Sequence, residues 1–195
     1  AAPMDQRPAR WRDNILSEAK QMKVLVEQML TLARADNNPM PSASAMEAVS
    51  LSDLATDCAL AFEPVAFEAG KPLEYEIAPD LTVTGDRDKL RRLISILLDN
   101  AVKYCTEQGQ IRLTAAHKGK NIILSIYNTS QPLTKENIDH LFDRFYRTDE
   151  SRNSKTGGYG IGLSVAKAVV EAHHGKIVAS SEDGNSLLIT VILKI

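Results

Sequence analysis

The segment from Arg10 to Ala35 contains neither glycine nor proline, and its hydrophobic pattern constrains the fold more than any other feature. Apolar or small residues recur at steps that alternate between four and three, at Ile15, Ala19, Met22, Val26, Met29 and Ala33. This spacing is typical of a helix that packs along a seam against other helices. The stripe is widened, as a bundle requires, by Leu25, Leu30 and Leu32. We therefore expect residues 1–36 to form one long helix of a helical bundle, with a helix packed on its own domain as the alternative.

The segment that follows, from Asp36 to Ser50, is rich in asparagine, proline and serine. Such a composition ends helices and is typical of linkers. We therefore expect a linker at residues 37–50 and a second, larger domain at residues 51–195. No run of residues approaches the roughly 18 consecutive apolar residues that a membrane span needs, so we expect this piece of the protein to be cytoplasmic.

Charge and cysteine content argue against several classes of function. The sequence has 23 lysines and arginines against 25 aspartates and glutamates, a formal net charge of −2, and the two signs are mixed along the chain. Proteins that bind nucleic acid without sequence preference carry a basic surface. Because this sequence has no excess of basic residues, we expect no nucleic-acid partner. The two cysteines, Cys58 and Cys105, form no C-x-x-C pair, which favours buried thiols over a redox or metal site.

Helical and strand-like segments alternate through the larger domain. We expect Ser52 to cap a helix from Asp53 to about Glu68, Asp86 to cap a second helix, and a third helix to end near His173. Strand patterns occupy residues 73–77, 81–84, 110–117 and 121–128, and a hairpin-like pair occupies 176–181 and 187–195. Helices interspersed with strands predict an α+β fold, a two-layer α/β sandwich with a mixed sheet.

Asn100 is unusual because it is a polar residue on the apolar stripe that Leu93 and Leu97 form along the second of these helices. Lys103 and Tyr104 follow one turn later on the same face. An amide oxygen, an ammonium and a phenol grouped beside a core face can coordinate a metal ion and meet phosphate oxygens. A partly exposed helix end explains the same residues without any ligand, so the pattern alone leaves both interpretations open.

The glycines of the segment TGGYGIGL lead directly into a helix. Bare backbone N–H groups at a helix N-terminus attract phosphate, although such glycines are also common in ordinary turns. The segment is neither the dinucleotide-binding fingerprint, which needs a flanking strand and an acidic partner, nor a Walker A loop, which needs Gly-Lys-Ser/Thr. Upstream, LFDRFYR and the polar residues after it fit an anchored flap that closes over an anion, or equally a short helix and a surface loop.

The order and spacing of three elements carry a family resemblance. DNAVKY, LFDRFYR and GGYGIGL resemble the N, F and G2 boxes of the sensor histidine kinases of two-component systems, and the resemblance covers Val49 to Ile195. The upstream run SEAKQMKVLVEQMLTLARAD resembles the second helix of the dimerisation and histidine-phosphotransfer domain of that family. The match is specific because the three motifs occur in the family's order and follow a segment that resembles the family's second bundle helix.

The resemblance implies the Bergerat, or GHKL, ATP-binding fold at residues 51–195, with ATP and Mg²⁺ as cofactors. By motif position, Asn100 would hold Mg²⁺ and would be catalytic together with Lys103. Residues 143–160 would form a mobile lid over the nucleotide. The ATP-binding residues would be Asn100, Lys103, Tyr104, Asn128, Pro132, Tyr146, Arg147, Gly158, Gly160, Ile161, Gly162 and Leu163.

The resemblance also implies the reaction of an ATP-dependent protein-histidine kinase. In that reaction the γ-phosphoryl group of ATP passes to a histidine on the helical bundle and later to an aspartate of a response regulator, mostly through positioning and charge stabilisation. The expected partners are therefore a response regulator and the protein's own dimerisation helices, in a homodimer. The full-length protein would be anchored to the membrane.

The chain lacks one element that this reaction requires. No H-box, a histidine followed by an acidic residue and a Leu-Arg-Thr-Pro-like run, is present. The four histidines all fall in the expected ATP-binding domain, at positions 117, 140, 173 and 174. We therefore expect that this chain cannot phosphorylate itself without a helix that carries the phosphate-accepting histidine.

Two further departures concern the ATP site. The G1 box is usually Asp-x-Gly-x-Gly, but here it reads NTSQP: Asn128 replaces the aspartate that receives the adenine amino group, and Ser130 and Pro132 replace the glycines. Ile96 stands four residues before Asn100, where these kinases often have a second asparagine. These substitutions motivate a second hypothesis, a degenerate nucleotide-binding or pseudokinase module that acts through dimerisation. A third hypothesis, a free-standing protein kinase or anti-sigma-like partner that uses the same fold on a serine, is disfavoured by the bundle-type helix.

Overall fold

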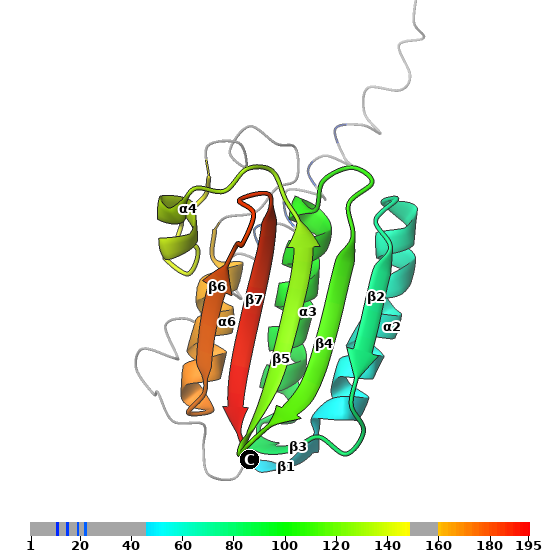
Figure 1. The fold of residues 1–195 in the computed structure, drawn as a ribbon, viewed down its shortest axis with the longest axis vertical. Coiled ribbons are helices and arrows are strands. Elements are labelled where there is room, and N and C mark those ends of the chain that lie inside the picture. Colours follow the sequence, from blue (N-terminus) through cyan, green and yellow to red (C-terminus); the bar gives the residue numbers. More distant parts are fainter. Residues whose placement is uncertain (1–10, 12–14, 16–18, 20–21, 23–45, 149–159) are drawn as a thin grey trace, which may run out of the picture.

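The computed structural model describes residues 46–148 and 160–195 together with four positions near the start of the chain, Trp11, Ile15, Ala19 and Met22 (Figure 1). Those four residues are helical and exposed to solvent, and the last three belong to the stripe expected of the first helix. The other residues of the expected helix, most of the expected linker, and residues 149–159 of the expected lid, Gly158 among them, lie outside the described residues.

Five strands form the central sheet, in the order β2-β4-β5-β7-β6. Their bounds are Leu73–Ile77 for β2, Ile111–Lys118 for β4, Asn121–Thr129 for β5, Lys176–Ser180 for β6 and Ser186–Lys194 for β7. β2 and β4 run parallel, whereas the other neighbouring pairs are antiparallel. The mixed sheet and the C-terminal hairpin expected from the sequence are therefore confirmed.

Three helices pack on one face of this sheet and form the second layer, α2 (Leu51–Glu68), α3 (Arg87–Tyr104) and α6 (Gly162–Ala172) (Figure 1). The short helix α4 (Lys135–Asp139) lies on the β6 side of the molecule. A second, two-stranded sheet pairs β1 (Glu47–Ser50) with β3 (Thr82–Gly85). The two-layer α+β sandwich is thus confirmed. In the described part of the chain, no helix has the length and apolar character needed to span a membrane.

The core between the layers follows from the alternation of burial along the strands. In β5, every second side chain from Ile122 to Asn128 is buried on the side of the helices. The stripe of α3 that meets the sheet includes Leu93 and Leu97, which are at most 1% exposed. Burying each such leucine contributes about 2 kcal/mol, so the stripe fixes the rotation of α3 about its axis and with it the place of Asn100.

The N-terminus of α2 differs from the expectation. Ser50, and not Ser52, caps the helix, because the Ser50 hydroxyl accepts a hydrogen bond from the N–H of Asp53 at 3.3 Å. The Ser52 hydroxyl instead donates to the Ala78 carbonyl at 2.7 Å and accepts from the N–H of Leu81 at 2.9 Å. Ser52 therefore ties α2 to the connection between β2 and β3. The last four residues of the expected linker also differ, because their backbone pairs with β3 and forms β1.

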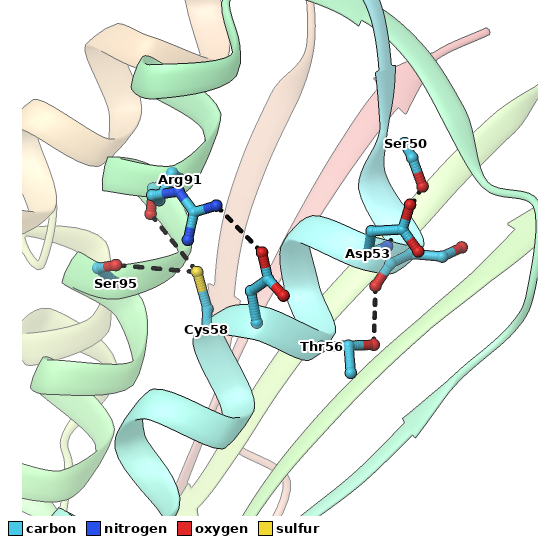
Figure 2. A network of polar contacts seen from close by, with 8 residues as sticks. Ser50, Asp53, Thr56, Cys58, Arg91 and Ser95 are labelled. Atoms are coloured by element: carbon cyan, nitrogen blue, oxygen red, sulfur yellow. Dashed lines mark hydrogen bonds and ion pairs between the residues drawn. The ribbon is translucent and has the colours of Figure 1, made fainter.

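Figure 2 shows a contact between α2 and α3 at Cys58. The thiol points toward α3, where its Sγ lies 3.9 Å from both the Arg91 carbonyl oxygen and the Ser95 hydroxyl. Burial raises the pKa of the Cys58 thiol, and the hydrogen bond with Ser95 offsets only part of this effect. Cys58 is therefore a protonated packing group, and Cys105 is buried as well, as expected for both cysteines.

A buried histidine joins α6 to the start of α3. His173, which follows α6, accepts a hydrogen bond at Nε2 from the N–H of Asp86 at 3.0 Å, and its Nδ1 donates to the Val169 carbonyl at 2.7 Å. Asp86 caps α3 as expected, by accepting from the N–H of Lys89 at 3.0 Å. Burial acts to raise the pKa of Asp86, but the Lys89 N–H and ammonium outweigh it and hold that pKa below its ordinary value. These contacts fix α3 and α6 relative to each other.

Candidate functional site

The end of α3 carries the first group of expected site residues. Asn100 and Tyr104 are partly exposed there, and Lys103 is exposed. The Lys103 ammonium forms an ion pair with the Asp99 carboxylate, with 2.7 Å between Nζ and Oδ2. Because both side chains are well exposed, this pair contributes about 0.5 kcal/mol at most. It therefore does not hold Lys103 against a stronger anion such as phosphate.

The end of β5 carries Asn128, the last inward-facing residue of the strand. Asn128 lies in the layer of the α3 side chains and is only 2% exposed. Its Nδ2 donates to the Thr129 carbonyl oxygen at 2.9 Å, while none of the described residues donates to its Oδ1. The Oδ1 atom is itself accessible, so this open acceptor can receive a hydrogen bond from a ligand or water.

Backbone contacts hold these two ends together. Cys105, the C-cap of α3, forms an isolated antiparallel bridge with Ser130. The N–H of Thr106 donates to the Thr129 carbonyl at 3.3 Å, and the Cys105 Sγ lies 3.4 Å from the Thr129 hydroxyl. The end of α3 and the end of β5 therefore meet at one edge of the sheet.

The N-terminus of α6 packs on the same part of α3. A Cβ at Gly162 would lie 3.5 Å from Cγ2 of Ile96, one turn before Asn100. Among the described residues, no side chain caps the first N–H groups of α6, and its first turn contains no acidic residue. Open N–H groups at the positive end of a helix dipole attract anions such as phosphate. Ile161 and Leu163 are buried in the core, so only their backbone can meet a ligand.

Gly160 joins the start of α6 to the aromatic segment Leu141–Arg147. It adopts the left-handed conformation, with φ of 69°, and its carbonyl accepts a hydrogen bond from the N–H of Phe145 at 2.9 Å. A Cβ at Gly160 would lie 2.6 Å from the Tyr146 carbonyl oxygen, which excludes a side chain. The aromatic and glycine elements, separate in the sequence, are therefore in direct contact.

Tyr146 belongs to a polar cluster with α4. Its hydroxyl accepts a hydrogen bond from Nδ2 of Asn137 at 3.0 Å, and its ring centroid lies 5.6 Å from that of His140. The Nδ1 of His140 lies 2.6 Å from the Asp143 carboxylate, and this hydrogen bond raises the pKa of His140. The contacts described for the Tyr146 side chain thus lead to α4 and not to the ends of α3 and β5. Arg147 is partly buried directly after it.

Pro132 lies in the loop after β5. This loop is held against the β6–β7 turn by two backbone hydrogen bonds, from the Ser130 N–H to the Asn185 carbonyl at 2.8 Å and from the Leu133 N–H to the Gly184 carbonyl at 2.7 Å. Pro132 is exposed, and neither bond needs the N–H that proline lacks. The loop therefore forms without the glycine that the family pattern has at this position.

Sequence reasoning missed two polar contacts at this site. Asp99 pairs with Lys103 at i, i+4 spacing, which is a signal that the sequence does contain. The Thr129 hydroxyl accepts a hydrogen bond from the N–H of Gln110 at 3.0 Å. No local pattern announces the second contact, because it depends on the pairing of β4 with β5.

Known proteins resemble this chain in sequence. Residues 85–195 match the family model described as histidine kinase-, DNA gyrase B-, and HSP90-like ATPase. The chain is 34% identical over 173 residues to the sensor protein DltS of Streptococcus agalactiae, which covers 89% of this chain and 43% of DltS. It is 31% identical over 180 residues to the signal transduction histidine-protein kinase BaeS of Escherichia coli, which covers 92% of this chain and 38% of BaeS. The chain thus spans less than half the length of these relatives.

Solved structures share the fold. Full-length ShkA in complex with AMPPNP superposes with a TM-score of 0.82 over 99% of this chain and 39% of that chain, at 22% identity. The histidine kinase AdeS of Acinetobacter baumannii gives a TM-score of 0.75 over 93% of this chain and 82% of that chain, at 24% identity. The chain therefore belongs to the histidine kinase-, DNA gyrase B- and HSP90-like ATPase family, and the curated relatives that it resembles are named as sensor proteins and a histidine-protein kinase.

Proposed function

We propose that this chain is the ATP-binding catalytic part of a kinase that donates the γ-phosphoryl group of ATP to a histidine on a helical bundle. The convergence of three features around the end of α3 supports this most directly. They are the open acceptor of Asn128, the polar end of α3 and the N-terminus of α6, where none of the described side chains caps the N–H groups. ATP offers the matching groups in one molecule, namely a donor on the base and phosphate oxygens for a metal ion and backbone N–H groups.

The end of α3 fits one Mg²⁺ ion. Mg²⁺ prefers oxygen ligands, keeps several of its waters, and is commonly held by one or two protein groups together with substrate phosphates. The partly exposed Asn100 would supply one amide oxygen to the ion. Apart from its waters, the ion would take most of its other ligands from the phosphates of the nucleotide. When bound, Mg²⁺ supplies positive charge that neutralises the phosphates during transfer.

The residues of this chain would position the nucleotide. Asn128 would accept a hydrogen bond from the adenine amino group, while Lys103 leaves its exposed pair with Asp99 to meet phosphate, with Tyr104 beside it. Phosphoryl transfer gains most from such positioning and from charge stabilisation. The other residues that we propose to contact ATP are Pro132, Tyr146, Arg147, Gly158, Gly160, Ile161, Gly162 and Leu163.

The proposed partners are a response regulator, as the onward phosphate acceptor, and a second copy of the protein. The kinase ThkA, whose fold this chain shares with a TM-score of 0.74 at 19% identity, was crystallised in complex with the response regulator protein TrrA. Ile15 and Met22 are 64% and 63% exposed, as an unpartnered bundle stripe would be. Light scattering should show the full-length protein as a dimer, and a strict monomer would contradict this proposal.

We also propose that this chain is a cytoplasmic domain and that the full-length protein is anchored in the membrane. The basis is family membership together with a match to less than half of each relative. Cell fractionation should place the full-length protein in the membrane pellet, and recovery in the soluble fraction would contradict the anchoring.

Calorimetric titration tests the nucleotide site. We expect micromolar binding of ADP and of a non-hydrolysable ATP analogue, and we expect Mg²⁺ to strengthen the binding of the analogue. Asn100→Ala should remove most of the Mg²⁺ effect without unfolding α3, because position 100 is partly exposed and alanine favours helices. Asn100→Asp keeps an oxygen ligand and should retain the Mg²⁺ effect. Absence of binding at millimolar nucleotide would overturn the proposal.

A further inference from the structure

Asn128 poses a problem of orientation that an aspartate would not. A carboxylate accepts hydrogen bonds whichever way it is turned, but an amide presents an oxygen on one side and an NH₂ donor on the other. In the structure the amide is held in one sense, with Nδ2 donating to the Thr129 carbonyl at 2.9 Å and Oδ1 left open. The reverse orientation would set Oδ1 against the Thr129 carbonyl oxygen, two acceptors with no proton between them.

The Thr129 carbonyl is itself held in place. It accepts a second hydrogen bond from the N–H of Thr106 at 3.3 Å, and the N–H of Thr129 donates to the Gln110 carbonyl at 3.2 Å. The Thr129 hydroxyl accepts from the Gln110 N–H at 3.0 Å and lies 3.4 Å from the Cys105 Sγ. Gly109 leaves no room for a Cβ beside that hydroxyl, so the segment packs closely on the end of β5.

We propose that the Thr129 carbonyl locks the Asn128 amide with its oxygen toward the base, so that the site selects purine nucleotides with a 6-amino group over those with a 6-oxo group. This inference rests on the proposed nucleotide site. A 6-amino group donates to the open Oδ1, whereas a 6-oxo group places a second acceptor against it with no proton between them. Sites built to pair with one polar group reject analogues that lack it. Asn128 is then the specificity determinant, and Thr129 is its positioning residue.

Paired calorimetric titrations with ADP and inosine diphosphate (IDP) test the lock. The two nucleotides differ at the 6-substituent and the N1 proton that goes with it, and share the sugar and phosphates. Wild-type protein should bind ADP at least about tenfold more tightly than IDP. Because this comparison needs no variant, it remains decisive even if a substitution at Thr129 prevents folding. Equal affinities would overturn the inference and leave the proposed nucleotide site standing, whereas binding of neither nucleotide would overturn both.

Two substitutions at Thr129 separate the lock from general packing. Thr129→Val keeps the side-chain shape but removes one of the contacts that fix the end of β5 to Gln110, so the Thr129 carbonyl should hold the Asn128 amide less firmly. ADP affinity should then fall and IDP affinity should rise, lowering their ratio at least about threefold. Thr129→Ser keeps the hydroxyl and should keep the wild-type ratio. A loss of affinity shared equally by both nucleotides would show a purely structural role and contradict the lock.

Asn128→Asp provides the matched background, because a carboxylate accepts in either orientation. We expect the Asn128→Asp protein to prefer ADP, and we expect Thr129→Val to leave that preference unchanged in this background. Thr129→Val can be compared in two backgrounds, one with asparagine and one with aspartate at position 128. If it lowers the preference for ADP equally in both, the orientation of the amide is not the cause and the inference is wrong.

Discussion

Replacing Gly160 by alanine should detach the glycine element from the aromatic segment. The backbone at Gly160 has φ of 69°, which costs an L-residue about 1 kcal/mol. The new Cβ would also lie 2.6 Å from the Tyr146 carbonyl oxygen and 2.8 Å from the Phe145 carbonyl carbon, both backbone atoms that no rotamer change can move. Relief requires breaking the hydrogen bond between the Phe145 N–H and the Gly160 carbonyl, about 1 kcal/mol more. The expected total is about 2 to 3 kcal/mol.

Gly70→Ala is the matched control. Gly70 has nearly the same φ, 68°, but a Cβ there would meet nothing within 4 Å. It should therefore lose only about 1 kcal/mol in urea denaturation. The excess loss in Gly160→Ala measures the close approach to the aromatic segment.

Hydrogen exchange at the Phe145 amide covers the case in which Gly160→Ala opens this contact locally while the core stays folded. Exchange at that amide should accelerate in Gly160→Ala and stay unchanged in Gly70→Ala. If both variants lose the same stability within about 0.5 kcal/mol, and Phe145 keeps its protection in both, the contact described here is refuted.

Asp86→Ala should cost about 1 kcal/mol in urea denaturation, because α3 loses its N-cap bond from the Lys89 N–H; unchanged stability would show that the cap is dispensable. Asp143 raises the pKa of His140, so the stability from this pair is full below the unfolded-state pKa and is lost as the pH rises through the folded-state pKa. The small stability advantage of wild type over His140→Gln should therefore shrink between about pH 6 and pH 8, and an advantage that grows with pH would contradict this. Because burial raises the pKa of Cys58, a thiol reagent at neutral pH should modify it only as the protein unfolds; rapid labelling of the native protein, mapped by mass spectrometry, would count against it.

The elements that the sequence predicts well are those decided by neighbours in the chain. Asp86 was predictable as a cap because it bonds Lys89, three residues on. The expectation that a serine before a helix caps it was wrong for Ser52, because its hydrogen-bond partners Ala78 and Leu81 lie far along the sequence. β1 was missed for a similar reason, since four residues become a strand only by pairing with β3. Long-range pairing is the part of the fold that local patterns do not contain.

The candidate site divides in the same way. Residue type and spacing single out Asn100 and the glycines, because a helical repeat and a glycine cluster are visible in one stretch of sequence. The sequence also identifies Asn128 as a departure from the family pattern. It says nothing about which way the amide faces, because that depends on the Thr129 carbonyl and on the hydrogen bonds that hold it.

Transfer of phosphate to histidine tests the central proposal most directly. The chain would be mixed with the part of the full-length protein that carries the phosphate-accepting histidine, in the presence of Mg²⁺ and ATP labelled on the γ-phosphate. We expect label on histidine, recognised by its lability in acid and stability in base, and loss of that label with Asn100→Ala. Nucleotide binding without labelled histidine at saturating ATP would contradict the kinase proposal and favour a regulatory module that binds nucleotide without transferring phosphate.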